Sequence, residues 1–277
     1  NILPHDLNYT EKRILNSWAK TEGMPDRVEV GAKFYLDRAQ GREQSWFSFT
    51  KEQSKELLPD NWRPSARNIV IYNSSEDEYE ALGIEWKNPL YPNQLDAIKR
   101  IIASLEQQRD GDIHVTLRMH PNNKDMAKSE LDKWYGLESK ILTVVHHDSP
   151  IDTYALLRNA DTVLTFGSTV GIEAVFWSKP SVLAGLSAYR NLGGTYNPSS
   201  HEELIKLLLN NKLPLKDKLP AIMYGYYMNT YGIPFRYFDA EGICNGKFKE
   251  IDLSKVKRSL FILGRLMINP LRKVLVE

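Results

Sequence analysis

Short apolar segments rich in β-branched residues alternate with amphipathic segments between residues 68 and 209. The apolar segments have the length and composition of buried strands, and they are Asn68–Tyr72, Ile113–Met119, Ile141–Val145, Thr162–Phe166 and Ser181–Gly185. Helical spacing is clearest in Asn93–Gln108, whose apolar positions are Leu95, Ile98, Ile101, Ile102 and Leu105. This alternation predicts an α/β fold, in which a parallel sheet carries helices on both of its faces.

Start signals support several of the predicted helices. Ser149 is expected to be an N-cap, with Pro150 at the first helical position and Asp152 in the first turn. Ser200 and Glu203 have the spacing of a capping box at the start of a later helix.

The regions before and after this part of the chain do not show the alternation of strands and helices. Residues 1–66 are polar and irregular, with one helix predicted around Glu11–Lys20. Residues 213–277 hold an aromatic cluster and then a basic amphipathic helix with Arg258, Arg265 and Arg272 seven residues apart. This helix is either a docking helix with a solvated basic face or a peripheral membrane attachment. The pattern therefore predicts three parts: an N-terminal segment over 1–66, the α/β domain over 67–212 and a C-terminal aromatic and basic helical region over 213–277.

Composition narrows the range of partners and compartments. The 277 residues are 42% hydrophobic and 26% charged, which is ordinary for a soluble globular protein. A net charge of +1 gives no reason to expect nucleic acid as a partner. Cys244 is the single cysteine, which excludes an internal disulfide and favours a reducing, cytoplasmic compartment. No apolar run approaches the ~20 residues of a membrane span, and no signal peptide is expected.

Polar residues follow four of the predicted strands, directly after each strand ends. They are Asn73-Ser74-Ser75, His120-Pro121, His146-His147 and Gly167-Ser168-Thr169. In an open parallel sheet, ligands bind outside the carboxyl ends of the strands. The sequence therefore predicts that these residues meet at one edge of the sheet and form a ligand site.

Two interpretations of Gly167-Ser168-Thr169 stay open at this point. Ser or Thr at a helix start is usually a cap for the backbone of the first turn. The same residues can also cradle a phosphate, because the N–H groups and the dipole of a helix start favour an anion. In the second interpretation Gly171 lets a ligand approach the first turn, and Glu173 reaches a ribose hydroxyl.

His120 can hydrogen-bond a phosphate, and Pro121 fixes the turn that aims it. Arg118 points to the same side of its strand as His120, and it is either a second phosphate contact or the partner of a nearby acid. We expect His147 to contact a base or a sugar. No metal is expected there, because neither a cysteine nor a second histidine at helical spacing supports one.

Asn73-Ser74-Ser75 is either an anion-binding nest or a polar turn with a serine cap. Glu76 and Asp77 follow it directly, and their charges disfavour a phosphate against this loop. We therefore expect the loop to contact the acceptor or the sugar of a donor.

The order of these motifs resembles a known family. "RMHP" after one strand, then "GSTVGIEA" and "KPSV" after later ones, resembles the nucleotide-binding half of GT-B glycosyltransferases, over about residues 68–209. It is most similar to the bacterial capsule polysaccharide biosynthesis family, which includes transferases of 3-deoxy-manno-octulosonic acid (Kdo). The resemblance implies a Rossmann-like domain in which His120, Ser168 and Thr169 hold the phosphate and nucleoside of a CMP-activated sugar, with Glu173 at the ribose.

The resemblance also implies a function. We expect a sugar transferase that uses a nucleotide sugar, with CMP-Kdo favoured, and an oligosaccharide or lipid-linked acceptor of a surface or capsular polysaccharide. No further cofactor is implied, and the expected location is the cytoplasm or the inner face of the plasma membrane, with contact to a polysaccharide-assembly complex. A general base must deprotonate the acceptor, and Asp6, Glu76 and Asp77 are the candidates.

Two other functions are compatible with the sequence. A polyol-phosphate transferase that uses CDP-glycerol has a similar His-Pro and Ser-Ser arrangement. A non-catalytic module that binds a glycan or a nucleotide is the third possibility, because only 66 residues precede the first strand and they show no βαβ pattern.

Overall fold

The computed structural model describes residues 6–42, 48–108, 112–232, 235–240 and 246–252. They divide between two compact units: the described residues up to 42 and from 49 to 230 form the first, and residue 48 and the described residues from 231 onward belong to the second. These units differ from the three parts expected from the sequence, because helices on both sides of the α/β domain pack with it in the first unit.

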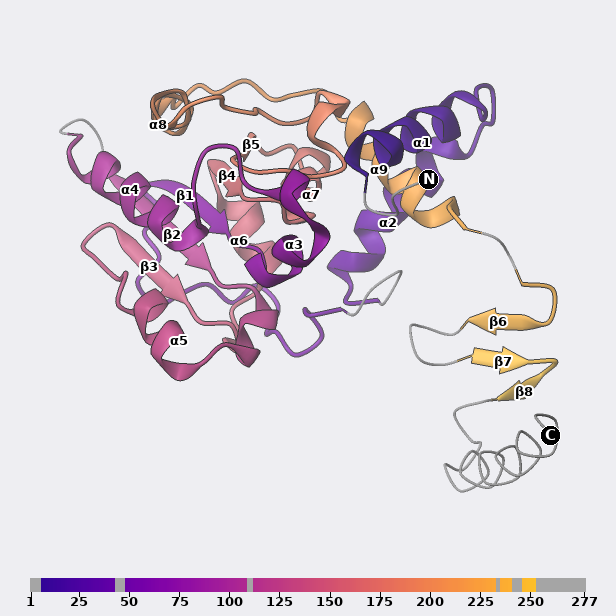
Figure 1. Ribbon diagram of the computed structural model, residues 1–277, viewed down its shortest axis with the longest axis horizontal. Helices are drawn as coiled ribbons and strands as arrows, with labels where there is room; N and C mark the ends of the chain where they lie inside the picture. The colour runs from indigo at the N-terminus through magenta and orange to yellow at the C-terminus, as the bar shows by residue number, and fades with distance from the viewer. Residues whose placement is uncertain (1–5, 43–47, 109–111, 233–234, 241–245, 253–277) are drawn as a thin grey trace, which may run out of the picture. The chain divides into compact units, whose positions relative to one another are not determined.

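A five-stranded parallel sheet forms the centre of the first unit and confirms the predicted fold class (Figure 1). The strands lie in the order β3-β2-β1-β4-β5. Their bounds are β1 Arg67–Tyr72, β2 Ile113–Arg118, β3 Leu142–Val145, β4 Thr162–Thr165 and β5 Ser181–Leu183. The central strand β1 pairs with β2 on one side and β4 on the other, so the strand order reverses between β1 and β4. Such a switch point is where ligands bind in open α/β sheets.

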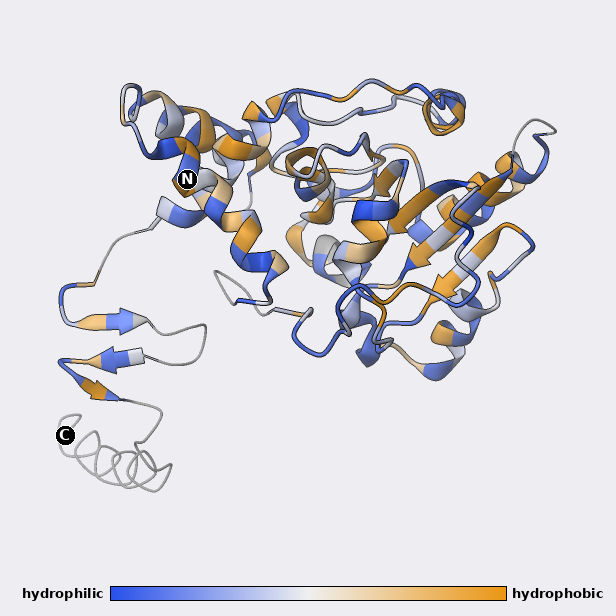
Figure 2. Ribbon diagram, turned by 180° about the vertical axis from the view of Figure 1, so that it is seen from behind, coloured by the Kyte–Doolittle hydropathy of each residue, from blue (hydrophilic) through white to orange (hydrophobic). Residues whose placement is uncertain are grey.

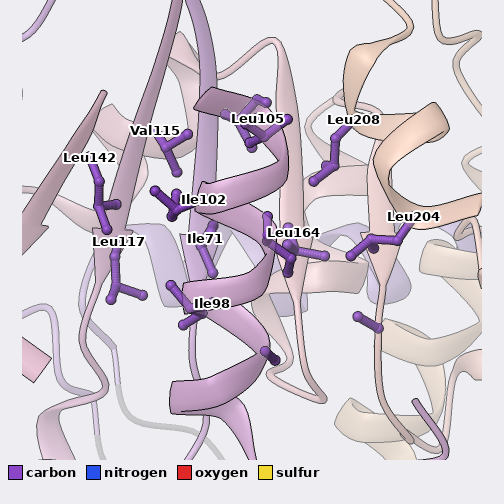
Figure 3. Close-up of a cluster of buried hydrophobic side chains, with 14 of the residues drawn as sticks. Ile71, Ile98, Ile102, Leu105, Val115, Leu117, Leu142, Leu164, Leu204 and Leu208 are labelled. Atoms are coloured by element: carbon purple, nitrogen blue, oxygen red, sulfur yellow. The ribbon is translucent and has the colours of Figure 1, made fainter. Parts of the chain in front are cut away.

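Helices cover both faces of this sheet. Three of them pack on one face in the largest apolar cluster: α4 Gln94–Glu106, α5 Lys128–Tyr135 and α8 His201–Leu209. Figure 3 shows Ile98, Ile102 and Leu105 of α4 lying against side chains of the strands. The other face holds α6 Thr153–Asn159 and α7 Val170–Phe176, whose apolar residues pack on Val70 and Val163. In Figure 2 the strands of this sheet are mostly orange, the colour of hydrophobic residues. Short elements complete the unit, namely α3 Glu76–Leu82, η1 Ile84–Trp86, η2 Pro121–Asp125 and η3 Arg190–Leu192.

The start of α6 differs from the prediction. The N-cap is Asp152, whose carboxylate accepts a 2.9 Å hydrogen bond from the Tyr154 N–H, and not Ser149. The reason is a loop from the N-terminal segment: Ser54 N–H donates to the Pro150 carbonyl, and Asp152 N–H donates to that of Leu57. These bonds hold the chain extended up to Asp152. The predicted Ser200 cap is confirmed, since its hydroxyl accepts from the Glu203 N–H at 3.1 Å.

The N-terminal segment is helical over most of residues 6–39. The predicted helix is present as α1 Leu7–Ala19, and a second helix, α2 Arg27–Ala39, was not predicted. Helix α2 packs against α9 Leu219–Thr230, which is the aromatic segment of the C-terminal region. Gly31 and Gly225 permit this close contact, because a Cβ on either would collide with backbone of the other helix.

The second unit contains strands that were not predicted, between the aromatic cluster and the predicted basic helix. Strands β6 Phe238–Ala240, β7 Gly246–Phe248 and β8 Ile251–Asp252 form an antiparallel sheet. The apolar residues Phe238, Phe248 and Ile251 pair directly across these strands. The predicted basic helix with Arg258, Arg265 and Arg272 lies outside the described residues. Within the described part of the chain, no helix combines the length and the apolar character that a membrane crossing needs.

His114 makes the stability of the first unit dependent on pH. Its ring, 3% exposed on β2, lies 3.2 Å from Asn68 Oδ1 and 3.0 Å from Thr143 Oγ1. Burial, and then the charge of Arg63, lower its pKa below 6.5. The unfolded chain therefore binds more protons than the folded one between this lowered pKa and about 6.5.

We expect the free energy of unfolding to fall as the pH is lowered from about 6.5 through the pKa of folded His114. Urea unfolding curves between pH 5 and 8 measure this effect. His114→Gln should flatten the curve, although His201, whose pKa is also lowered, contributes in the same direction. An unchanged slope in His114→Gln would show that the effect arises elsewhere.

Candidate functional site

The residues expected at the ligand site lie at one edge of the sheet, because all five strands are parallel. Three of them are in direct contact at the ends of β1 and β2. The His120 N–H donates to Asn73 Oδ1 at 2.6 Å, and Ser75 Oγ lies 3.2 Å from His120 Nδ1. The structure thus brings the Asn73–Ser75 loop against His120, while their contact with a ligand stays a prediction.

These contacts define the state of the His120 ring. Nδ1 accepts a hydrogen bond from the Asn122 N–H at 3.2 Å at the start of η2, where Pro121 is the first residue. Since Nδ1 is an acceptor, the Ser75 hydroxyl donates to it and Nε2 carries the ring proton. The Phe49 ring packs edge-on against the imidazole, with 5.5 Å between centroids. The ring is therefore fixed in orientation and presents an N–H donor.

Two buried polar atoms beside this histidine have no hydrogen-bond partner among the described residues. They are Asn73 Nδ2 and Ser74 Oγ, in side chains of residues that are 1% and 6% exposed. The backbone of the same loop is held by Gln94, whose Oε1 accepts from the Ser74 N–H at 2.8 Å. Buried polar atoms without partners are rare in folded proteins and call for an explanation such as a water or an ion. Their position at the switch point fits a site that is completed by a ligand.

A second group surrounds the loop after β4. Glu173 of α7 is 1% exposed, and both of its carboxylate oxygens are bonded. Oε1 accepts from Arg38 Nε at 3.1 Å and from Thr169 Oγ1 at 3.2 Å, while Oε2 accepts from the Tyr154 hydroxyl at 2.6 Å. Arg38 belongs to α2, so the N-terminal segment contributes directly to this loop.

This network keeps its charges. Burial alone lowers the pKa of Arg38, but the Glu173 carboxylate outweighs it, so the pKa is raised and the guanidinium stays protonated. Burial and Glu173 both raise the pKa of Tyr154, which keeps its proton. The site therefore holds a fixed ion pair beneath the Ser168–Thr169 turn.

The two hydroxyl groups of that turn differ in what they can do. Thr169 Oγ1 donates to Glu173 and accepts from Arg38 Nη2 at 3.3 Å. Ser168 Oγ accepts from the Val170 N–H at 3.3 Å, which leaves its own proton to be donated. Of the two, Ser168 is the better donor toward a ligand. The ribose contact expected for Glu173 stays a prediction, and its oxygens are occupied within the protein.

Arg118 holds the loop after β3. Its Nη1 donates to the His146 carbonyl at 2.7 Å and its Nη2 to that of Ser149 at 3.1 Å, and burial lowers its pKa to about 10. Its hydrogen-bond partners are therefore backbone carbonyls, while the charges of Asp148 and Asp152 also favour its protonated form. The His146 ring stacks on Tyr135 with 3.7 Å between centroids, and His147 beside it is half-buried. Ligand contacts by Arg118 and His147 stay predictions.

The candidate bases occupy different places. Asp6 caps α1, where its carboxylate accepts from the Tyr9 N–H at 3.1 Å. Glu76 is next to Ser75, and its Oε1 accepts from the Gln94 N–H at 2.6 Å. The side chain of Asp77 is outside what the structure describes. Only Glu76 is thus placed at the edge of the sheet with a described side chain.

Gly167 and Gly171, on either side of the Ser168–Thr169 turn, are needed for different reasons. Gly167 has φ 147°, in the region that favours glycine. At Gly171, the space expected for a ligand is taken by Tyr189, whose hydroxyl donates to the Ser168 carbonyl at 2.5 Å. A Cβ on Gly171 would collide with that hydroxyl and lie 2.7 Å from Thr165 Oγ1.

Gly171→Ala should therefore lower the free energy of unfolding by roughly 1 to 3 kcal/mol, the usual cost of overpacking. Thermal unfolding of Gly171→Ala, Tyr189→Phe and the double variant measures this. The double variant should recover part of the loss, because the colliding oxygen is gone. Purely additive losses would contradict this contact as the cause.

Sequence reasoning missed Arg38 and Tyr154. Arg38 lies one turn after Phe34 and Tyr35 on the buried face of α2, in the pattern Gly31, Phe34, Tyr35, Arg38. A cation that continues an apolar face at this spacing was the available signal. Tyr154 is in the first turn of α6 and gave no signal that distinguishes it from a core residue.

Comparisons with known proteins agree with the sequence resemblance. The family model described as "Capsule polysaccharide biosynthesis protein" matches residues 69–224, more than half of the chain. Over 139 residues the chain is 31% identical to the capsule polysaccharide export protein KpsS of Escherichia coli, and the match covers 48% of this chain and 33% of that protein. The chain thus spans about a third of that relative.

Solved structures that are similar to this chain include two of KpsC from Thermosulfurimonas dismutans. Its β-Kdo 2,7-transferase is 17% identical with a TM-score of 0.45, and 79% of this chain matches 57% of that one. Its β-Kdo 2,4-transferase is 14% identical with a TM-score of 0.44, and 74% of this chain matches 56% of that one.

Proposed function

Because the chain belongs to the capsule polysaccharide biosynthesis family, we propose that it is a glycosyltransferase that moves a sugar from a nucleotide-activated donor to a bacterial surface or capsular polysaccharide acceptor. The favoured donor is CMP-Kdo. The acceptor is an oligosaccharide or a lipid-linked saccharide. The reaction takes place in the cytoplasm or at the inner face of the plasma membrane, and the region 253–277 is the proposed contact to that surface.

One observation carries this proposal: an oriented histidine at the end of β2 is bonded to the loop after β1, next to the switch point of the parallel sheet. His120 is fixed through Nδ1 by Ser75 and Asn122, so that Nε2 presents a proton. Asn73 and Ser74 add buried polar atoms without partners at the same place. Donors of this kind suit the phosphate of a nucleotide, because hydrogen bonds to an anion are about twice as strong as neutral ones.

The proposed chemistry is displacement of the nucleotide by an acceptor hydroxyl. As the bond from sugar to phosphate breaks, negative charge grows on the leaving phosphate. His120 Nε2–H and the Ser168 hydroxyl would donate to it, and the Arg38–Glu173 ion pair would hold the Ser168–Thr169 turn in place. Because these groups are held by the protein beforehand, no reorganisation is needed during the reaction. The acceptor proton passes to a carboxylate, for which Glu76 is the described candidate at this edge.

Stabilisation by nucleotides tests the proposal. At a CMP concentration about 100 times its Kd, the free energy of unfolding should rise by about 2.7 kcal/mol, which corresponds to a Tm increase of roughly 5 to 10 °C. AMP, with the same phosphate and a larger base, should protect less. Equal protection by AMP, or none by CMP, would contradict a cytidine nucleotide donor. Competition between CMP-Kdo and CDP-glycerol for the CMP site then distinguishes the sugar transferase from the polyol-phosphate transferase.

A further inference from the structure

A small polar cleft lies beside the candidate donor site. Its walls come from the end of α2, the loop around residues 50–56 and the first turns of α6, and its volume is about 220 Å³. Ligand pockets for drug-sized molecules are usually about 300 to 1,000 Å³. The cleft therefore suits one sugar residue, or the end of a chain, better than a complete nucleotide sugar.

The cleft adjoins both groups of the site. Thr50 lines it, and the neighbouring residue Phe49 packs on the His120 ring. Tyr154 lines another wall, and its hydroxyl donates to Glu173, which also holds Thr169. A molecule in the cleft would thus lie next to the side chains that fix both donor loops.

The lining has the chemistry of a carbohydrate site with a positive bias. The amides of Gln40 and Gln53 and the hydroxyl of Thr50 can both donate and accept hydrogen bonds, as sugar hydroxyls require. Three cationic side chains face two carboxylates in the lining. Both carboxylates are already bonded, since Glu56 accepts from Arg158 at 2.6 Å and Asp152 accepts from the N–H groups of Glu56 and Tyr154.

From this placement and charge we infer that the cleft is the acceptor subsite and that it binds a saccharide residue with an anionic group, such as a carboxylate. Lys51 and Lys55 supply the attraction for that group, and Tyr154 connects the subsite to the donor loop. The identification of the saccharide as the acceptor rests on the proposed function. Recognition of an acidic sugar by the cleft can be measured separately.

Binding of two monosaccharides that differ in one group tests the inference. Glucuronate and glucose differ by a carboxylate at C6, and both can be titrated into the full chain by calorimetry at low ionic strength. Glucuronate should bind more tightly than glucose. The double variant Lys51→Gln/Lys55→Gln should weaken glucuronate binding about threefold to tenfold, as expected for charge contacts from two exposed lysines. CMP binding should be unchanged in this variant.

A matched control is Lys99→Gln/Lys128→Gln, which removes the same charge from exposed positions on α4 and α5. It should leave glucuronate binding unchanged. The inference is overturned if glucose binds as tightly as glucuronate, if both double variants behave alike, or if CMP displaces glucuronate competitively. Glucuronate binding without any CMP binding would support the cleft as a saccharide site and contradict the proposed donor site.

Discussion

Glu173→Ala is expected to lower the free energy of unfolding by about 3 kcal/mol, the lower end of the range for removing one partner of a buried ion pair, because the side chain of Arg38 is 26% exposed. Glu173 is 1% exposed and accepts hydrogen bonds from Arg38, Thr169 and Tyr154. Without its carboxylate, the guanidinium of Arg38 loses its counter-charge, and the Tyr154 hydroxyl is left buried without its acceptor.

Urea unfolding of the wild type and Glu173→Ala measures this loss. The matched control is Glu202→Ala, whose ion pair with Arg100 has side chains that are 78% and 57% exposed. An ion pair between exposed side chains contributes little to stability, so this variant should remain close to the wild type. Similar losses in the two variants would contradict a special role for the Glu173 network. A double-mutant cycle of Glu173→Ala and Arg38→Met should show a large coupling in the free energy of unfolding, because the two side chains interact directly.

His120→Ala is expected to abolish the stabilisation by CMP, with a loss of at least about 2 kcal/mol at saturating nucleotide. The variant removes the oriented Nε2–H donor and also leaves Ser75 and Asn122 without their acceptor. His120→Asn is a useful second variant, since its side chain can restore the cap of η2 but lacks the imidazole.

The control for this change is His201→Ala. His201 also makes two hydrogen bonds through its ring, to Tyr91 at 2.7 Å and to Ser104 at 2.9 Å, but it tethers α8 to α4. The His201→Ala variant should have a lower Tm without ligand, and CMP should still raise its Tm by the full amount seen with the wild type. If His120→Ala keeps the CMP increase as well, the histidine is not part of the donor site.

The sheet could be predicted from the sequence because its strands are short, apolar and buried on both faces. Runs such as Ile69–Tyr72 have no competing pattern, and the polar residues after them mark the edge where ligands bind. The start of α6 could not be found in the same way. Ser149 is a good local cap, and only the pairing of Pro150 and Asp152 with the distant residues 54–57 moves the start of the helix.

The N-terminal contribution to the site was harder to predict. In α2 the apolar positions are interrupted by charges, and its close packing on α9 depends on one glycine in each helix, Gly31 and Gly225. The Arg38–Glu173 pair joins residues 135 positions apart. No local pattern connects such residues, so the partner of Glu173 becomes visible only once the fold has brought α2 against α7.

The position of CMP in a crystal of the complex tests the central claim most directly, because the claim concerns one place in the fold. The account predicts a phosphate within hydrogen-bond distance of His120 Nε2 and the Ser168 hydroxyl, at the carboxyl ends of β1, β2 and β4. CMP bound away from these strand ends, or in the cleft lined by Tyr154 and Lys55, would contradict it.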